Sequence, residues 1–136
     1  MKGASFMPPK ESHYPADWLR IAEKDLQRVH RLLEIQDSEA AGFYLQQAVE
    51  KFLKAYLLSK GWRLQRIHDL EPLLNAALAY DSTLEQYRLT LQRITGFYFV
   101  DRYPLMLESG MTETDVREAL AQIDGLVGTI RTQLQH

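Results

Sequence analysis

Apolar residues recur every three or four positions over most of this chain, which is the spacing of one buried face of an α-helix. Four long stretches show this period, and strand-like alternation of apolar and polar residues is missing. The stretches therefore predict four long helices. Their apolar seams are Leu19, Ala22, Leu26, Val29 and Leu33; Ala41, Leu45, Ala48, Phe52 and Ala55; Leu84, Tyr87, Leu91, Ile94 and Tyr98; and Val116, Leu120, Ile123, Val127, Ile130 and Leu134.

Short polar side chains and glycine mark the ends of these helices. Ser38 is suited to cap the second helix, and Gly61 to end it in a left-handed conformation. Asp69 can cap a short third helix that begins at Leu70. The fourth helix is expected to open at Ser82 or Thr83.

Two further signals bound the last two long helices. Pro104 pushes the residue before it out of the helical region, so the fourth helix should end at about Arg102. Thr112 with Asp115 three residues later is a variant of the capping box, so the last helix should begin there.

The pattern predicts an all-α protein, an antiparallel up-and-down four-helix bundle with a short extra helix. Residues 1–15 hold Pro8, Pro9 and Pro15 without any period, so we expect a flexible N-terminal arm there. Residues 16–136 should form the bundle as one domain. A chain of 136 residues is long enough to bury a core without staples.

The amino-acid composition limits the kinds of binding and catalytic sites that the chain can form. The absence of cysteine excludes disulfides and thiolate ligands. The four histidines, at 13, 30, 68 and 136, lack metal-ligand spacing, and no glycine-rich phosphate loop occurs, so we expect neither a metal nor a cofactor. No apolar run is long enough to span a membrane, and no signal segment opens the chain, so a cytoplasmic protein is expected.

Charge is unevenly distributed in a chain whose net charge is only -2. The segment from Lys51 to His68 contains five cations and no acid. Within it Lys51 and Lys54 follow Gln47 at helical spacing, which predicts one polar stripe. The stripe is either a solvated face or a contact for phosphate or a partner. The cations could also simply complement the carboxyl end of a helix.

The predicted end of the fourth helix is unusual because Phe97–Val100 is apolar on all sides. One bundle cannot bury four successive faces of a helix, so part of the run should meet a second copy of the chain in a homodimer. Arg102, beside Tyr103, could hold a phosphate or a base. Alternatively, Arg102 pairs with Asp101 or with a helix carbonyl.

Four segments resemble the HEPN domain family, in the family's order. Trp18–Leu26 resembles its opening, and Gln46–Ala55, read QQAVEKFLKA, resembles its QQAxEKxLKA signature. His68, Asp69 and Leu70 resemble its T-H-D-L segment, with Ile67 in place of threonine. Arg102, Tyr103 and Pro104 resemble its R-Y-P element. The resemblance covers roughly residues 16–132.

The resemblance implies a four- or five-helix up-and-down bundle that usually forms a homodimer, and it implies a link to nucleotides or RNA. It also implies a minimal nucleotidyltransferase partner in toxin–antitoxin or resistance systems. Many members are metal-independent ribonucleases, with an arginine followed a few residues later by a histidine. Arg102 matches that arginine, but positions 107, 108 and 109 hold Leu, Glu and Ser. Arg63 and His68 have the right spacing, but they follow the second helix, which is the wrong place.

Three hypotheses follow. The first is a non-catalytic module that binds a nucleotide or RNA phosphate and works with a nucleotidyltransferase. The second is a ribonuclease toxin that uses Arg102 with another polar group. The third is a structural helical dimer. The candidate ligand-binding residues are Gln47, Lys51, Lys54, Arg102 and Tyr103, and the candidate motif residues are His68, Asp69, Asp101 and Pro104.

Overall fold

The computed structural model describes residues 12–102 and 111–135, with side chains described for 12–98 and 111–135. These residues are all-helical, as the sequence predicts. The expected arm therefore lies outside the described residues up to position 11. The elements are α1 (Pro15–Glu34), α2 (Ser38–Ser59), α3 (Leu70–Leu78), the 3-10 helix η3 (Ser82–Tyr87), α4 (Arg88–Arg102), α5 (Glu113–Gln122) and α6 (Asp124–Leu134).

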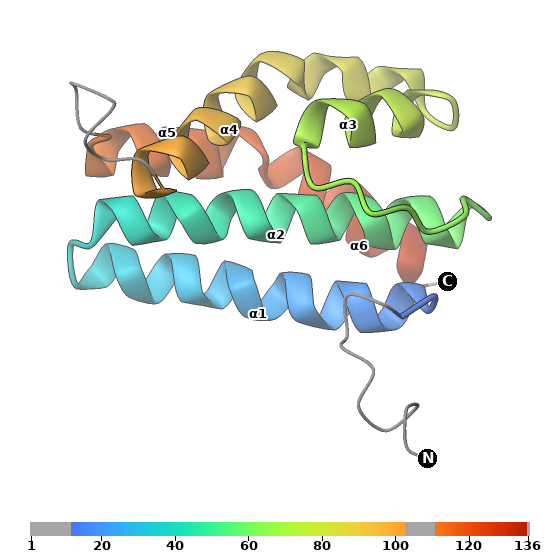
Figure 1. The fold of residues 1–136 in the computed structure, drawn as a ribbon, viewed down its shortest axis with the longest axis horizontal. Coiled ribbons are helices and arrows are strands. Elements are labelled where there is room, and N and C mark those ends of the chain that lie inside the picture. The colour runs from blue at the N-terminus through green and yellow to red at the C-terminus, as the bar shows by residue number, and fades with distance from the viewer. Residues whose placement is uncertain (1–11, 103–110, 136) are drawn as a thin grey trace.

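Helices α1 and α2 lie side by side along their whole length, joined by a tight turn (Figure 1). The predicted cap of α2 is one residue out of place. Asp37, rather than Ser38, accepts a hydrogen bond from the backbone of Ala40. A carboxylate at this position also complements the positive end of the helix dipole, which a hydroxyl does less well.

The connection after α2 returns along that helix (Figure 1). Gly61 has a φ of 91°, which confirms the predicted left-handed stop. The side chain of Gln46 donates to the carbonyl of His68 at 3.2 Å, and buried Leu70 anchors the start of α3. Asp69 occupies the N-cap position, but its side chain makes no cap hydrogen bond, so the predicted cap is wrong. The Asp69 carboxylate is left for other contacts.

Two predicted helices are interrupted. The fourth opens as the 3-10 turn η3, capped by Asp81, before α4 begins at Arg88. The last is divided at Ile123 into α5 and α6. Glycines at 125 and 128 lower helix propensity just beyond the break. The capping box of Thr112 and Asp115 at the start of α5 is confirmed, with both of its hydrogen bonds present.

The core is one apolar cluster to which every helix contributes. Phe97 belongs to it with 6% of its surface exposed, and Tyr98 is half-buried. Two residues of the apolar run on α4 are thus covered within the chain. The side chains of Phe99 and Val100 lie outside the described residues. In the described part of the chain, no helix has the length and hydrophobicity needed to cross a lipid bilayer.

Candidate functional site

A polar cleft of about 260 Å³ lies where α2, the end of the connection before α3, and α4 meet. One stripe of α2, at positions 43, 46, 47 and 50, forms its wall, because residues three and four apart share a helix face. Thr95 and Tyr98 of α4 face that stripe. We call this space the α2–α4 cleft, and its lining is Phe43, Gln46, Gln47, Glu50, His68, Asp69, Thr95 and Tyr98.

A chain of contacts between Lys54, Glu50 and His68 ends in this cleft. Glu50 is 4% exposed, and one of its carboxylate oxygens contacts Lys54 Nζ at 2.9 Å and His68 Nδ1 at 3.1 Å. The ammonium of Lys54 also lies over the Trp18 ring, 5.1 Å from its centroid. The negative charge of Glu50 is therefore balanced inside the protein. The His68 side chain, 65% exposed, is held through one ring nitrogen, so Nε2 is the nitrogen available for another contact.

Two glutamines fix the neighbouring part of the cleft. Gln46 is buried and binds the backbone of His68, while Gln47 donates to the side-chain oxygen of Gln46 at 2.6 Å. The glutamines thus tie α2 to the connection that carries His68 and Asp69. Gln47 is only partly buried, so the rest of its amide can still act as donor and acceptor.

Aromatic rings form the opposite end of the cleft. Phe43 and Tyr98 stack with their centroids 5.5 Å apart and an angle of 18° between the rings. Tyr44 meets Phe43 edge-on at 5.2 Å. Arg102 follows Tyr98 by four residues in the same helix, so its Cα lies on the same helix face, one turn further along. Its side chain, like that of Asp101, lies outside the described residues, as do Tyr103 and Pro104 altogether.

Of the two alternatives for the stripe, a solvated face is wrong at Lys54, which is 2% exposed. Lys54 pairs with Glu50, one turn earlier on α2, and both side chains are buried. Lys51 is also engaged, since its Nζ contacts the buried carboxylate of Asp25 at 2.5 Å, and Arg28 binds the same carboxylate at 2.6 Å. Asp25 of α1 and Glu50, which directly precedes the acid-free segment on α2, thus balance two of the five cations in that segment.

The structure brings Gln47, His68 and Asp69 together and keeps Lys51 and Lys54 turned to other partners. Sequence reasoning missed Phe43, Gln46 and Tyr98 as cleft residues, and Asp25 as the partner of Lys51. One signal was present in the sequence. Asp25 lies three residues after Ala22 of the first seam, so an acid stands at the edge of a buried helix face. The face of the second helix that carries Lys51 and Lys54 could have been expected to pair with this acid.

The cleft has the chemistry of a binding site for a small polar ring system. It combines a flat aromatic wall, amide and carboxylate groups that recognise polar edges, and an imidazole with one nitrogen still available. Among the side chains that the structure describes, those of residues 12–98 and 111–135, no three from histidine, aspartate or glutamate gather as a metal site.

A small all-helical domain with a polar cleft between its second and fourth helices defines the structural class. The family model of the HEPN domain matches residues 15–133, so the chain belongs to the HEPN domain family. The fold is similar to that in the crystal structure of TT1696 from Thermus thermophilus. The TM-score is 0.68 at 23% identity, over 88% of this chain and 97% of that one. No curated protein matches the sequence.

Proposed function

We propose that this protein is a non-catalytic HEPN module that binds a nucleotide or an RNA phosphate in the α2–α4 cleft. The single observation that carries the proposal is the convergence of Gln47, His68 and Asp69 with the stacked pair of Phe43 and Tyr98. Aromatic rings stack on bases, and amides and carboxylates bind base edges and ribose hydroxyls.

In this proposal the phosphate lies at the Arg102 end of the cleft. Arg102 binds it through the guanidinium, and Tyr103 adds aromatic surface. His68, at the other end of the cleft, binds a polar edge of the base or a ribose hydroxyl through Nε2. Lys51 and Lys54 do not touch the ligand in this scheme. Lys54 holds Glu50, which holds His68, and Lys51 ties α2 to Asp25 of α1. The carboxylate of Glu50 does not repel a phosphate, because Lys54 balances it.

The quaternary part of the proposal is a homodimer of antiparallel bundles formed by α1, α2, α4 and the α5–α6 pair, with α3 as the extra helix. We further propose a cytoplasmic protein that works with a minimal nucleotidyltransferase, in a toxin–antitoxin or resistance type of system. Phe99 and Val100, the two apolar residues of the run that follow the covered Phe97 and Tyr98, support the dimer. Light scattering should then give about twice the 15.8 kDa chain mass, and a mass of one chain contradicts the dimer.

Binding of ribonucleoside monophosphates, measured by calorimetry, tests the proposal. We expect Arg102→Ala to weaken binding about tenfold or more, since a charge-assisted contact with phosphate is lost. The matched control is Arg117→Ala on α5, whose exposed side chain pairs with Glu113. Equal affinity in the wild type and Arg102→Ala, or no binding of any nucleotide or short RNA, contradicts the proposal and leaves the structural dimer.

One observation favours a second function, a metal-independent ribonuclease. The cleft holds an imidazole against a buried carboxylate, an arrangement suited to proton transfer. That function requires cleavage of RNA in the presence of a chelator, abolished in His68→Ala. Our proposal expects no appreciable cleavage, because no histidine follows Arg102 before the last residue of the chain.

A further inference from the structure

Hydrogen bonds within the protein decide which polar atoms of the α2–α4 cleft are left for a ligand. The side chain of Gln46 donates to the backbone carbonyl of His68, so its nitrogen is committed there and its oxygen faces away. That oxygen accepts a hydrogen bond from Nε2 of Gln47. The orientation of the Gln47 amide is thereby fixed. It offers the cleft Oε1 as an acceptor and one further N–H.

The imidazole of His68 is oriented by the same kind of contact. Its Nδ1 lies 3.1 Å from a carboxylate oxygen of Glu50, and a carboxylate can only accept a hydrogen bond. The proton of the neutral ring is therefore on Nδ1, and Nε2 carries a lone pair. Because the ammonium of Lys54 already balances Glu50, the ring can contact this carboxylate without being charged. Nε2 of His68 is thus a second acceptor.

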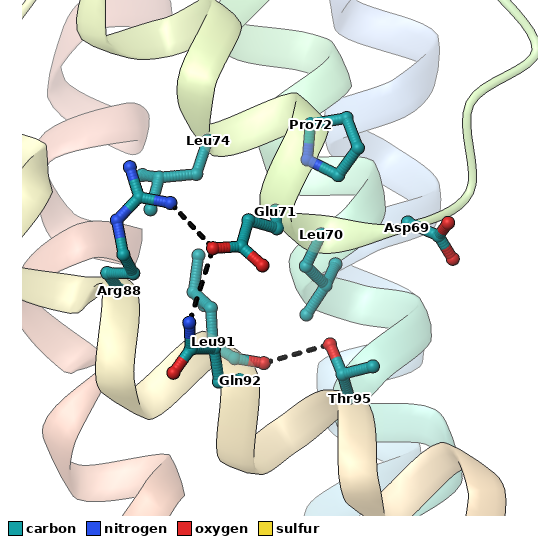
Figure 2. Close-up of a pocket in the computed structure, with 9 residues that line it drawn as sticks. All are labelled: Asp69, Leu70, Glu71, Pro72, Leu74, Arg88, Leu91, Gln92 and Thr95. Atoms are coloured by element: carbon teal, nitrogen blue, oxygen red, sulfur yellow. Dashed lines mark hydrogen bonds and ion pairs between the residues drawn. The ribbon is translucent and has the colours of Figure 1, made fainter.

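Thr95 and Asp69 add two more acceptors. The hydroxyl of Thr95 donates to the backbone carbonyl of Leu91 at 3.0 Å, so its lone pairs are what it can offer a ligand. Figure 2 shows this hydrogen bond in the pocket between α3 and α4, which shares Thr95 and Asp69 with the cleft. Asp69 holds the N-cap position of α3 without a cap hydrogen bond, so its carboxylate is available to a ligand.

A ligand in such a cleft needs N–H groups on the edge that it presents. An acceptor that meets another acceptor loses its hydrogen bond to water without replacement. Among the nucleic-acid bases, guanine carries the most N–H groups on one edge, where its ring N1–H and its 2-amino group stand side by side. Two adjacent donors match the two oxygens of a carboxylate, as in the paired contacts of arginine with aspartate.

We propose that the cleft selects guanine among the bases and that Asp69 determines this specificity, by accepting hydrogen bonds from N1–H and the 2-amino group. This inference rests on the proposed function of the α2–α4 cleft. The base lies against the stacked rings of Phe43 and Tyr98, and its phosphate stays at the Arg102 end. The negative charge of Asp69 therefore meets donors and not the phosphate. Nε2 of His68 remains for a ribose hydroxyl.

Calorimetry with matched ligands tests the inference. GMP, IMP, AMP and UMP share the ribose and the 5′-phosphate, and IMP differs from GMP only in lacking the 2-amino group. We expect GMP to bind about tenfold more tightly than IMP, the effect of one hydrogen bond to a charged group. Binding of IMP, AMP or UMP as tight as that of GMP overturns the inference and leaves the proposed function intact. No binding of any of the four overturns both.

One variant tests the role assigned to Asp69. Asn and Asp are equally favoured at an N-cap, so Asp69→Asn should fold as the wild type does. Its amide keeps one acceptor for N1–H but turns a donor toward the 2-amino group, so GMP should bind only as tightly as IMP. The matched control, Glu34→Gln, removes one carboxylate charge from an exposed position at the end of α1 and should keep the tenfold preference. A preference for GMP that survives Asp69→Asn contradicts the inference.

Discussion

At the scale of single residues, the central feature is a buried ion pair between two side chains of α2. Lys54 and Glu50 are 2% and 4% exposed, and each is the other's main counter-charge. Burying such a pair contributes little to stability compared with apolar residues of the same size, but breaking it is costly. The pair holds His68 in the cleft, so its structural cost serves the positioning of a cleft residue.

Lys54→Met keeps most of the side-chain volume and removes the charge that balances Glu50. We expect the free energy of unfolding to fall by about 3 kcal/mol, because a buried carboxylate loses its ammonium partner. Denaturant titration measures this, with exposed Lys24→Met as the control. Adding Glu50→Leu to Lys54→Met should recover much of the loss. If Lys54→Met and the control unfold alike, the buried pair is not as described.

At the scale of elements, the start of α5 depends on the ionised form of Asp115. Hydrogen bonds from the Thr112 backbone and hydroxyl lower the pKa of Asp115, because they favour the carboxylate. A lowered pKa in the folded state gives stability that is present above the ordinary carboxyl pKa and is lost as the pH falls through the folded value.

Asp115→Asn keeps the acceptor and removes the charge. Its melting temperature should lie below that of the wild type at neutral pH, and the difference should shrink as the pH falls from about 5 to about 2. Thermal unfolding followed by circular dichroism at several pH values measures both quantities. A difference that stays constant down to the acid end shows that the capping carboxylate is not the cause.

Close packing of α2 against α4 depends on a glycine in α2. A Cβ at Gly42 would lie 2.9 Å from the Cβ of Phe97 and also against the Met111 side chain. Gly42→Ala should therefore destabilise the protein by about 1–3 kcal/mol. Gly96→Ala on α4, where nothing lies within 4 Å, should stabilise it by about 0.5–1 kcal/mol. The same sign for both variants contradicts this packing.

The helices and their ends were largely predictable, since seams, glycine stops and caps are local signals. The Gly61 stop and the Thr112–Asp115 box are of this kind. The split at Ile123 and the 3-10 turn η3 were not predicted, because the apolar periodicity continues across both interruptions. The N-cap of α2 is Asp37 and not the predicted Ser38, because both of these adjacent residues have side chains that can cap a helix.

At the scale of the whole molecule, the site depends on burial that no single segment reveals. Gln47, His68 and Asp69 stood out as motifs and do share a cleft. The burial of Lys54 did not stand out, because whether a lysine on a helix faces water or a neighbouring tryptophan depends on how α1 packs on α2. The same packing gives Lys51 its partner in Asp25. Charge patterning along the sequence therefore overstated the basic surface.

The most direct measurement for the central claim is a nuclear magnetic resonance titration of the labelled protein with UMP. The account predicts saturable shifts of the Gln47 side-chain amide and the His68 ring, both of which line the cleft. Residues around Arg117, which does not line the cleft, should not move. Shifts that fail to saturate, or that fall outside the α2–α4 cleft, contradict the account.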